Sequence, residues 1–371
     1  MTRTTEMLRV VHAHPGVTRA DAARHLGIGT GAATELVARL TQASLLAEAP
    51  AARSGTRGRP TTALVAHPSG PLVLAAQITH RAWRLDTVEL GGRAIATVSA
   101  GHKGTAWSDV VTGVTSGINR MRETYGERVR ALGIAAPGPV TSDRRLDATT
   151  SGWHDVDLHD LWPDAPLLVA GNDASLAATA ESARGAATGA AVALHLLIEY
   201  GLGGAVVDQG RLVIGAHGAS GEFGHMPFGD PAVICPCGAR GCWGTAVDGT
   251  ALARHLGQPA PADPVSYAKA VIASPAPAER AAVAMAAAAL GRGIAGLVNG
   301  LDADLVILSS IAADLLAAAP AELHSAYQSG LMAIRRSSPP SLLPAALGPD
   351  GPIAGAAEAA WSSLLGQLAQ R

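Results

Sequence analysis

All three cysteines of this 371-residue chain lie within one eight-residue segment, Cys235-Pro-Cys237-Gly-Ala-Arg-Gly-Cys242. An odd number of cysteines cannot all pair as disulfides, and the two glycines between them let the backbone turn tightly enough for the sulfur atoms to converge. His225 lies ten residues before the first cysteine. Three thiolates and one imidazole form the soft tetrahedral shell that zinc prefers, and four protein ligands leave no position for water. The pattern therefore predicts a structural zinc site formed by His225, Cys235, Cys237 and Cys242, rather than three buried cysteines without a metal.

Segments typical of strands and of helices alternate along the chain after residue 70. Apolar residues make up 48% of the chain and charged residues 16%, a composition that supports sizeable cores and argues against global disorder. Two sets of strands, each with helices, predict an α/β body of two lobes with a cleft between them. The expected strands are 72–78, 82–90, 93–100, 129–136, 167–170, 192–199, 203–207, 211–214 and 304–309, and the expected helices are 109–125, 174–184, 279–300 and 355–370.

The N-terminal residues form a separate pattern. The pattern predicts three helices, at 4–13, 19–26 and 30–43. Thr18 would cap the second helix and Gly27 would end it. This spacing resembles a helix-turn-helix, whose second helix enters the major groove of DNA. A basic, glycine-rich tip between two short strands then predicts a wing. Residues 1–60 carry eight arginines against four acidic residues, a net charge of +4, whereas the rest of the chain has a net charge of −6. This asymmetry suggests a polyanionic partner, although random charge scatter explains the number nearly as well. The basic wing together with the helix pattern favours DNA binding over the alternative, a small helical interaction domain with a flexible linker.

Candidate DNA contacts follow from this pattern. The exposed residues at the start of the third helix would read base edges, and two arginines of the wing tip would contact phosphates or the minor groove. A homodimer would place two such helices in successive major grooves, which predicts a pseudo-palindromic operator. The candidate residues are Thr30, Thr34, Glu35 and Arg39 in the helix, and Arg57 and Arg59 in the wing.

The segment Gly221-Glu222-Phe223-Gly224-His225-Met226, followed by C-x-C-G-x-x-G-C, resembles the zinc-binding signature of the ROK family (repressors, open reading frames and sugar kinases). The resemblance extends through 137–140, 152–156 and 172–174, and it covers nearly the whole chain, including the N-terminal winged helix-turn-helix of the repressor branch. It implies the actin-like (sugar-kinase, RNase H-like) fold, in which two α/β lobes enclose a cleft for sugar and nucleotide. The expected domains are 1–66, a first lobe of 70–178 plus 354–371, and a second lobe of 179–353 with the zinc loop and the effector and dimerisation surface.

The resemblance also implies roles for single residues. Asn172 and Asp173 resemble the pair that hydrogen-bonds sugar hydroxyls, and in the family's kinases this aspartate is the general base. Glu222 and His225 resemble further sugar contacts, and Gly138 resembles a backbone position that lines the pocket. Asn172-Asp173 is also a suitable helix N-cap, and both roles can hold together.

The nucleotide elements of the family's kinases are degraded in this chain. The first phosphate loop, D-x-G-G-T-K, is replaced by 77–82, QITHRA, and the later Gly-Gly-Gly turn by Ser309-Ser310-Ile311. The second loop, G-T-G-x-G-G-G, is replaced by 199–205, EYGLGGA, so that Glu199 would repel a triphosphate. Gly244 stands where the family usually has a sugar-binding glutamate. The chain is therefore expected not to be a kinase. The resemblance implies a sugar or sugar-like ligand, and Gly244 leaves open a sugar bound less tightly, a modified sugar or a different small molecule.

These observations predict a cytoplasmic, ligand-responsive transcriptional regulator, expected to repress, with structural zinc, and assembled as a homodimer or a dimer of dimers. The polar N-terminus argues against a secretory signal, and no apolar stretch of about 18 residues lacks a charge or a breaker. Two alternatives stay open. Asp173 favours an ATP-dependent sugar kinase with an accessory DNA-binding domain, and Gly244 favours a constitutive DNA-binding protein with a vestigial pocket.

Overall fold

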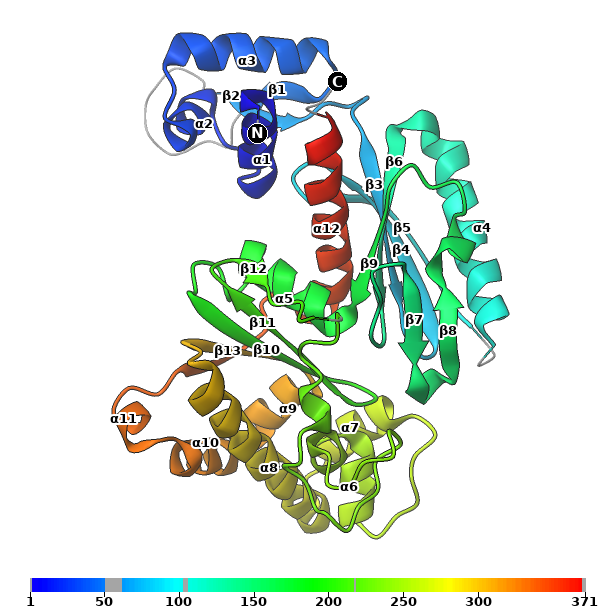
Figure 1. Ribbon diagram of the computed structural model, residues 1–371, viewed down its shortest axis with the longest axis vertical. Helices are drawn as coiled ribbons and strands as arrows, with labels where there is room; N and C mark the ends of the chain where they lie inside the picture. Colours follow the sequence, from blue (N-terminus) through cyan, green and yellow to red (C-terminus); the bar gives the residue numbers. More distant parts are fainter. Residues whose placement is uncertain (1, 51–61, 103–105, 217, 369–371) are drawn as a thin grey trace. The chain divides into compact units, whose positions relative to one another are not determined.

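The computed structural model describes residues 2–50, 62–102, 106–216 and 218–368 (Figure 1). Each of its two compact units has a five-stranded sheet, which confirms the expected mixed α/β fold with two sheets. The lobe boundaries expected from the sequence stay a prediction. The first unit contains Met1–Pro137, Asp155–Gly171 and Ala356–Arg371, and the second contains Gly138–His154 and Asn172–Gly355.

The first unit begins with three helices and a two-stranded hairpin. As expected, the Thr18 hydroxyl oxygen accepts a hydrogen bond from the backbone N–H of Asp21 at 3.1 Å, and Gly27 ends the second helix in the left-handed region with φ 60°. Arg57 and Arg59 lie outside the described residues. The elements are α1 (Arg3–Ala13), α2 (Arg19–Leu26), α3 (Thr30–Gln42), β1 (Leu46–Pro50) and β2 (Thr62–Ala66), with antiparallel pairing from Leu46↔Ala66 to Pro50↔Thr62.

A buried polar contact holds α1 against other parts of the first unit. Nδ1 of His12 accepts a hydrogen bond from the backbone N–H of Gly91 at 3.0 Å, and Nε2 lies 3.1 Å from a carboxylate oxygen of Glu358 in α12 (Gly351–Leu368). Because Nδ1 is the acceptor, Nε2 carries the proton that is donated to Glu358. The His12 ring also lies 5.6 Å from the Trp361 ring, centroid to centroid. The N-terminal helices are therefore packed on this unit through specific contacts.

The sheet of the first unit has the strand order β5-β4-β3-β6-β9. β3 pairs parallel with β6 and antiparallel with β4, and its side chains are buried at all positions except Gln77. Figure 1 shows this sheet between α12 and α4 (Trp107–Tyr125). Gly117 of α4 packs against the Trp83 ring, and Gly133 leaves room for the backbone of Ala356 in α12. The strands are β3 (Leu72–Ile78), β4 (Ala82–Glu89), β5 (Ala94–Gly101), β6 (Val129–Ala136) and β9 (Leu168–Asn172).

The sheet of the second unit has the order β12-β11-β10-β13-β14, with β10 antiparallel to β11 and parallel to β13. Its strands are β10 (Val192–Ile198), β11 (Leu202–Asp208), β12 (Arg211–Leu212), β13 (Leu305–Ser310) and β14 (Ser341–Pro344). The helices are α5 (Asp173–Arg184), α6 (Gly249–His255), α7 (Pro264–Ala273), α8 (Pro277–Leu301), α9 (Ile311–Ala318), α10 (Pro320–Gly330) and α11 (Ala333–Arg336). A separate two-stranded sheet pairs β7 (Arg145–Ala148) with β8 (Trp153–Asp157).

Most expected elements are found within a few residues of their predicted positions. The strand expected at 211–214 is shorter than predicted, because β12 covers only Arg211–Leu212. The helices α6, α7, α9 and α10 were not predicted. α6 and α7 begin at the capping residues Asp248 and Asp263, and α10 has proline in its first turn, whereas α9 has neither signal.

α8 is the central helix of the second core. Among the described residues, α8 alone is long and apolar enough to cross a membrane. The sequence analysis expected no membrane-spanning helix, because every long apolar stretch contains a charged residue or a helix breaker. Two thirds of its most apolar window (67%) is buried inside the protein, as is typical of a core helix in a soluble protein. Its glycines allow close packing: a Cβ at Gly291 would collide with the backbone oxygen of Leu323 in α10, and a Cβ at Gly293 with the Trp243 ring.

We predict that Gly291→Ala destabilises the second unit, because the added methyl group forces α8 and α10 apart. Overpacking of this kind costs about 1–3 kcal/mol of unfolding free energy. Gly300→Ala is the matched control, since nothing lies within 4 Å of a Cβ there and alanine favours a helix. Urea unfolding of both variants measures the difference, and equal stability of the two would contradict the packing described here.

Candidate metal centre and ligand site

The three cysteines and His225 come together in the second unit. Their four ligand atoms all lie within 4.8 Å of one another. Sγ of Cys237 lies 3.7 Å from Sγ of Cys242, and Sγ of Cys235 lies 3.7 Å from Nδ1 of His225. Two sulfur ligands of a tetrahedral zinc ion are about 3.8 Å apart, given zinc–sulfur bonds of about 2.3 Å, whereas a disulfide bond is about 2 Å long. The four side chains therefore form a group that could hold a metal ion.

The loop that carries these ligands is closed by its own backbone. The N–H of Cys235 donates to the carbonyl oxygen of Ala239 at 2.8 Å, and the N–H of Gly238 donates to Cys235 at 2.9 Å. Gly238 has φ 90°, a conformation that glycine adopts without strain. Burial raises the pKa of Cys242 to about 12, so this sulfur becomes a thiolate only when a cation offsets the cost of burial. The donor set and its burial fit a bound metal.

Strand β11 brings the metal loop and α5 together, because it begins with Leu202 followed by two glycines. A Cβ at Gly203 would lie 3.1 Å from Cβ of Ala174 in α5, and a Cβ at Gly204 would lie 2.6 Å from the Phe223 ring. Gly221 and Gly224 in turn approach the backbone oxygens of Gly204 and Leu202 too closely for any side chain. The N-terminus of α5 and the turn at 221–226 therefore pack against the same short strand.

Asn172 and Asp173 lie at the N-terminus of α5. The Asn172 side-chain oxygen accepts a hydrogen bond from the N–H of Ser175 at 3.2 Å, which confirms the N-cap role that the sequence suggested. One Asp173 oxygen accepts from the N–H of Ala174 at 2.7 Å. Burial, and then repulsion by Glu199 and Glu222, raise the pKa of Asp173 to about 7. The Asp173 side chain is half-buried at this helix N-terminus.

Glu199 is a residue that the sequence analysis did not assign to the ligand site. It follows β10, and its half-buried carboxylate makes no hydrogen bond or ion pair to another described residue. Burial raises the pKa of Glu199, and the positive charge of Lys269 acts in the opposite direction. The sequence analysis noted Glu199 in the degraded second phosphate loop as a residue that would repel a triphosphate. It did not predict that Glu199 acts on Asp173.

Glu222 and His225 connect the ligand site with the metal ligands. Oε2 of Glu222 lies 3.7 Å from Nε2 of His225, while Nδ1 of His225 faces Cys235. Such a carboxylate partner commonly orients a metal-binding histidine. Gly138 also lies in the second unit, with φ 141°, and a Cβ there would collide with the backbone oxygen of Asp147. The negative charges of Glu199 and Glu222 both act on Asp173, and Gly138 packs against β7.

The predicted DNA-contacting residues of α3 are all exposed. Ala33, Leu36, Val37 and Leu40 form the buried stripe of α3, as expected. The Thr34 hydroxyl donates to the carbonyl oxygen of Thr30 at 2.8 Å within the helix. The exposed residues of α3 include the four predicted ones, Thr30, Thr34, Glu35 and Arg39, together with the small residues Gly31, Ala32 and Ala38.

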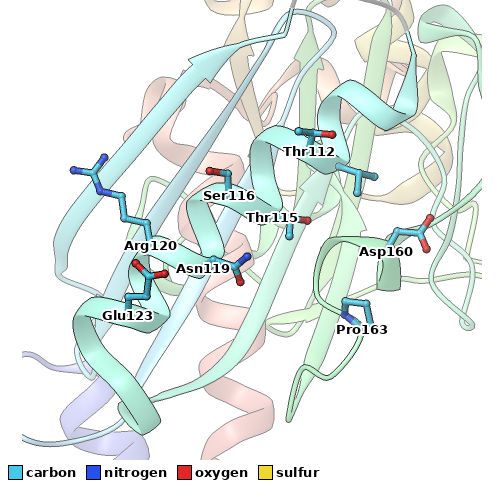
Figure 2. A pocket seen from close by; sticks show the side chains of 9 residues that line it. Thr112, Thr115, Ser116, Asn119, Arg120, Glu123, Asp160 and Pro163 are labelled. Atoms are coloured by element: carbon cyan, nitrogen blue, oxygen red, sulfur yellow. The ribbon is translucent and has the colours of Figure 1, made fainter.

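An open groove of about 770 Å³ lies along α4 in the first unit (Figure 2). Polar side chains of α4, including Asn119, Arg120 and Glu123, line one wall, and Asp160 and Pro163 line the other. None of the predicted DNA, metal or effector residues lines this groove. Its mixed charges do not define a ligand.

Three comparisons with known proteins agree on the family. The sequence model of the ROK family matches residues 91–362. A glucokinase of Halalkalibacterium halodurans is 29% identical over 188 residues, which are 49% of this chain and 53% of that protein. A kanosamine kinase of Amycolatopsis mediterranei is 36% identical over 144 residues, 37% of this chain and 46% of that protein. The chain thus spans about half the length of these curated relatives.

A solved structure covers the N-terminal segment as well. The crystal structure of a ROK family transcriptional regulator, a homolog of the E. coli MLC protein, superposes with a TM-score of 0.76. The superposition covers 98% of this chain and 97% of that chain, at 20% identity. It shows that the two chains share their overall fold.

We predict that Asp173 makes stability depend on pH. Its pKa is about 7 in the folded protein against an ordinary 3.8, so between these values the folded state binds more protons than the unfolded state. Stability therefore falls as the pH rises through this range, by up to ~1.4 kcal/mol per pH unit. The amide of Asp173→Asn does not titrate, so the variant should not lose stability through this group as the pH rises. Urea unfolding between pH 5 and 8 should show wild type losing stability relative to the variant.

Asp208→Asn is the control for this measurement, because Asp208 is exposed at the end of β11. Its unfolding free energy should follow that of wild type across the pH range. Parallel curves for wild type and Asp173→Asn would mean that Asp173 is an ordinary carboxylate.

Proposed function

This chain belongs to the ROK family, and we propose that it is a DNA-binding transcriptional regulator that responds to a sugar or sugar-like ligand. The observation that carries the proposal is the group of exposed polar residues on α3, a helix with a fully buried stripe in a segment ahead of the family match. In this proposal α2 and α3 form a helix-turn-helix, and β1 and β2 form the base of a wing. The net charge of +4 on residues 1–60 favours DNA as the partner.

The degraded nucleotide elements support a regulator without kinase activity. Thr79 now closes its own turn: its backbone N–H donates to the carbonyl oxygen of Ala82 at 2.9 Å, and its hydroxyl accepts from the N–H of Ala82 at 3.1 Å. The Ser309 hydroxyl lies 2.8 Å from Nε2 of the buried His195. Glu199 adds a negative charge beside Asp173, where a phosphoryl group would have to approach.

A sugar kinase is the second candidate, favoured by Asp173 and by the kinase relatives. A carboxylate with a pKa of about 7 suits a general base at neutral pH. ATP-dependent phosphorylation of a hexose that Asp173→Asn abolishes would establish this candidate in place of the regulator.

The ligand and metal roles complete the proposal. Asn172, Asp173, Glu222 and His225, with the backbone at Gly138, would contact the ligand. His225, Cys235, Cys237 and Cys242 would hold a structural zinc ion, which would fix the turn that carries Glu222. We also propose a cytoplasmic homodimer or dimer of dimers that binds a pseudo-palindromic operator, with the domains 1–66, 70–178 plus 354–371, and 179–353.

We predict that Cys237→Ser lowers the zinc content of the purified chain from about one ion per chain and lowers its melting temperature, since metal binding is coupled to folding. Metal analysis and thermal unfolding measure both effects. Arg240→Ala is the matched control, because Arg240 is exposed in the same loop. Unchanged zinc in Cys237→Ser would refute the cluster.

We predict that Arg39→Ala weakens binding to DNA fragments selected from a random pool by about tenfold or more, through loss of a base contact. The double variant of Arg57→Ala and Arg59→Ala should instead flatten the salt dependence by about two units of slope, through loss of phosphate contacts. Fluorescence anisotropy at several salt concentrations measures both.

Arg211→Ala controls for the lost charge, because Arg211 is exposed on β12 in the second unit. Its affinity and salt slope should match those of wild type. Failure of the full chain to select any sequence from the pool would contradict the proposal of a DNA-binding regulator.

A further inference from the structure

One face of α1 connects the N-terminal helices to the rest of the first unit. Leu8 and His12 lie four residues apart, so they share this face, and both are buried. His12 contacts α12 and the turn between β4 and β5. Leu8 and Trp361 of α12 line the same crevice, which at about 10 Å³ is too small to hold more than one water molecule. This face of α1 is therefore closely packed against α12.

His12 uses both nitrogen atoms of its ring in this contact. Nδ1 accepts from the backbone N–H of Gly91 at 3.0 Å, and Nε2–H donates to the Glu358 carboxylate at 3.1 Å. The side chains of His12 and Glu358 are only 8% and 13% exposed, so water competes little for these hydrogen bonds. A group that accepts on one side and donates on the other fixes α1 in direction as well as in distance.

The covalent connection after the N-terminal helices and hairpin would not hold them as tightly. β2 ends at Ala66 and β3 begins at Leu72. Between them, Nε–H of Arg128 donates to the carbonyl oxygen of Gly70 at 2.9 Å, which leaves 67–69 free to change conformation. A segment of this length spans up to about 10 Å when it is extended. One base pair displaces a half-site by about 3.4 Å along the DNA axis, so this connection alone would tolerate a shift of about three base pairs.

The position of α3 follows that of α1. α1 packs against both α2 and α3. Met7 and Val11 of α1 are buried, as are Leu36 and Leu40 of α3. Close-packed helices move together, because their side chains interdigitate. A contact that fixes α1 therefore also fixes the exposed residues of α3.

Resting on the proposed DNA-binding dimer, we propose that His12 is a positioning residue for operator recognition. It holds α3 of each copy in one place on the first unit, so that the dimer accepts one spacing between the two half-sites. Without the contacts of His12, each α3 could shift on its connection, and operators with other spacings would be bound as well. The two helices would also be less preorganised for simultaneous binding, which lowers affinity for the paired half-sites.

The spacing between half-sites is the readout that a merely stabilising contact would not change. DNA fragments that the full chain selects from a random pool are rebuilt with one, two and three base pairs added between the half-sites, and fluorescence anisotropy measures binding. Wild type should lose about tenfold or more in affinity for one added base pair. His12→Phe keeps a ring beside Trp361 but removes both hydrogen bonds, so its loss should be less than about threefold. Its affinity for a single half-site should equal that of wild type.

The carboxylate partner provides a second route to the same contact. Glu358→Ala removes the acceptor for Nε2–H and should also broaden the accepted spacing, so it tests the contact if His12→Phe fails to fold. Glu358→Gln keeps a side-chain oxygen that can accept from Nε2–H, and it should retain the wild-type spacing profile. His159→Phe is the matched control, because His159 is exposed in the first unit.

Amide hydrogen exchange of the free protein separates this proposal from the proposed function. The N–H of Gly91 should exchange faster in His12→Phe than in wild type, because it loses its acceptor. Unchanged exchange at Gly91 would refute the contact whether or not the chain binds DNA. Faster exchange with an unchanged spacing profile in both His12→Phe and Glu358→Ala would overturn the positioning role and leave DNA binding standing. If wild type selects no paired half-sites, the proposed DNA-binding dimer is wrong and the positioning role is wrong with it.

Discussion

The absence of side chains at Gly203 and Gly204, near the start of β11, is the constraint on which the proposed ligand site depends. Gly203 and Gly204 let the N-terminus of α5 and the turn at 221–226 reach the same stretch of backbone. A single Cβ at Gly221 would collide with that strand. Close packing of this kind places Asp173 near Glu222, and His225 connects Glu222 to the cysteine cluster. Metal ligands and ligand-site acids are thus parts of one packed arrangement.

Local sequence signals predicted the features that depend on neighbouring residues. The spacing of the cysteines predicted their convergence with His225, and Thr18, Gly27 and Asn172 mark helix ends where the sequence placed them. Short alanine-rich helices such as α9 were missed, because alanine occurs on both their buried and exposed faces and leaves little periodicity. The strands and the longer helices were predicted from the spacing of apolar residues, with a period of two in strands and 3.6 in helices.

The proximity of Glu199 to Asp173 could not be predicted in the same way. It depends on the antiparallel register of β10 and β11 and on how closely α5 approaches Gly203, and neither is encoded in a short motif. The sequence identified Glu199 only as a residue that opposes a triphosphate. The structure gives the same negative charge a second consequence, because it acts on a neighbouring acid as well as on any phosphate.

Helix α12 runs without a break between two packing contacts. At its start, Gly355 leaves room for the backbone of Leu176 in α5, and further along Glu358 binds His12 of α1. If binding at one end changes affinity at the other, thermodynamic linkage makes the effect mutual: an operator that tightens ligand binding must itself be bound more tightly when the ligand is present, by the same factor.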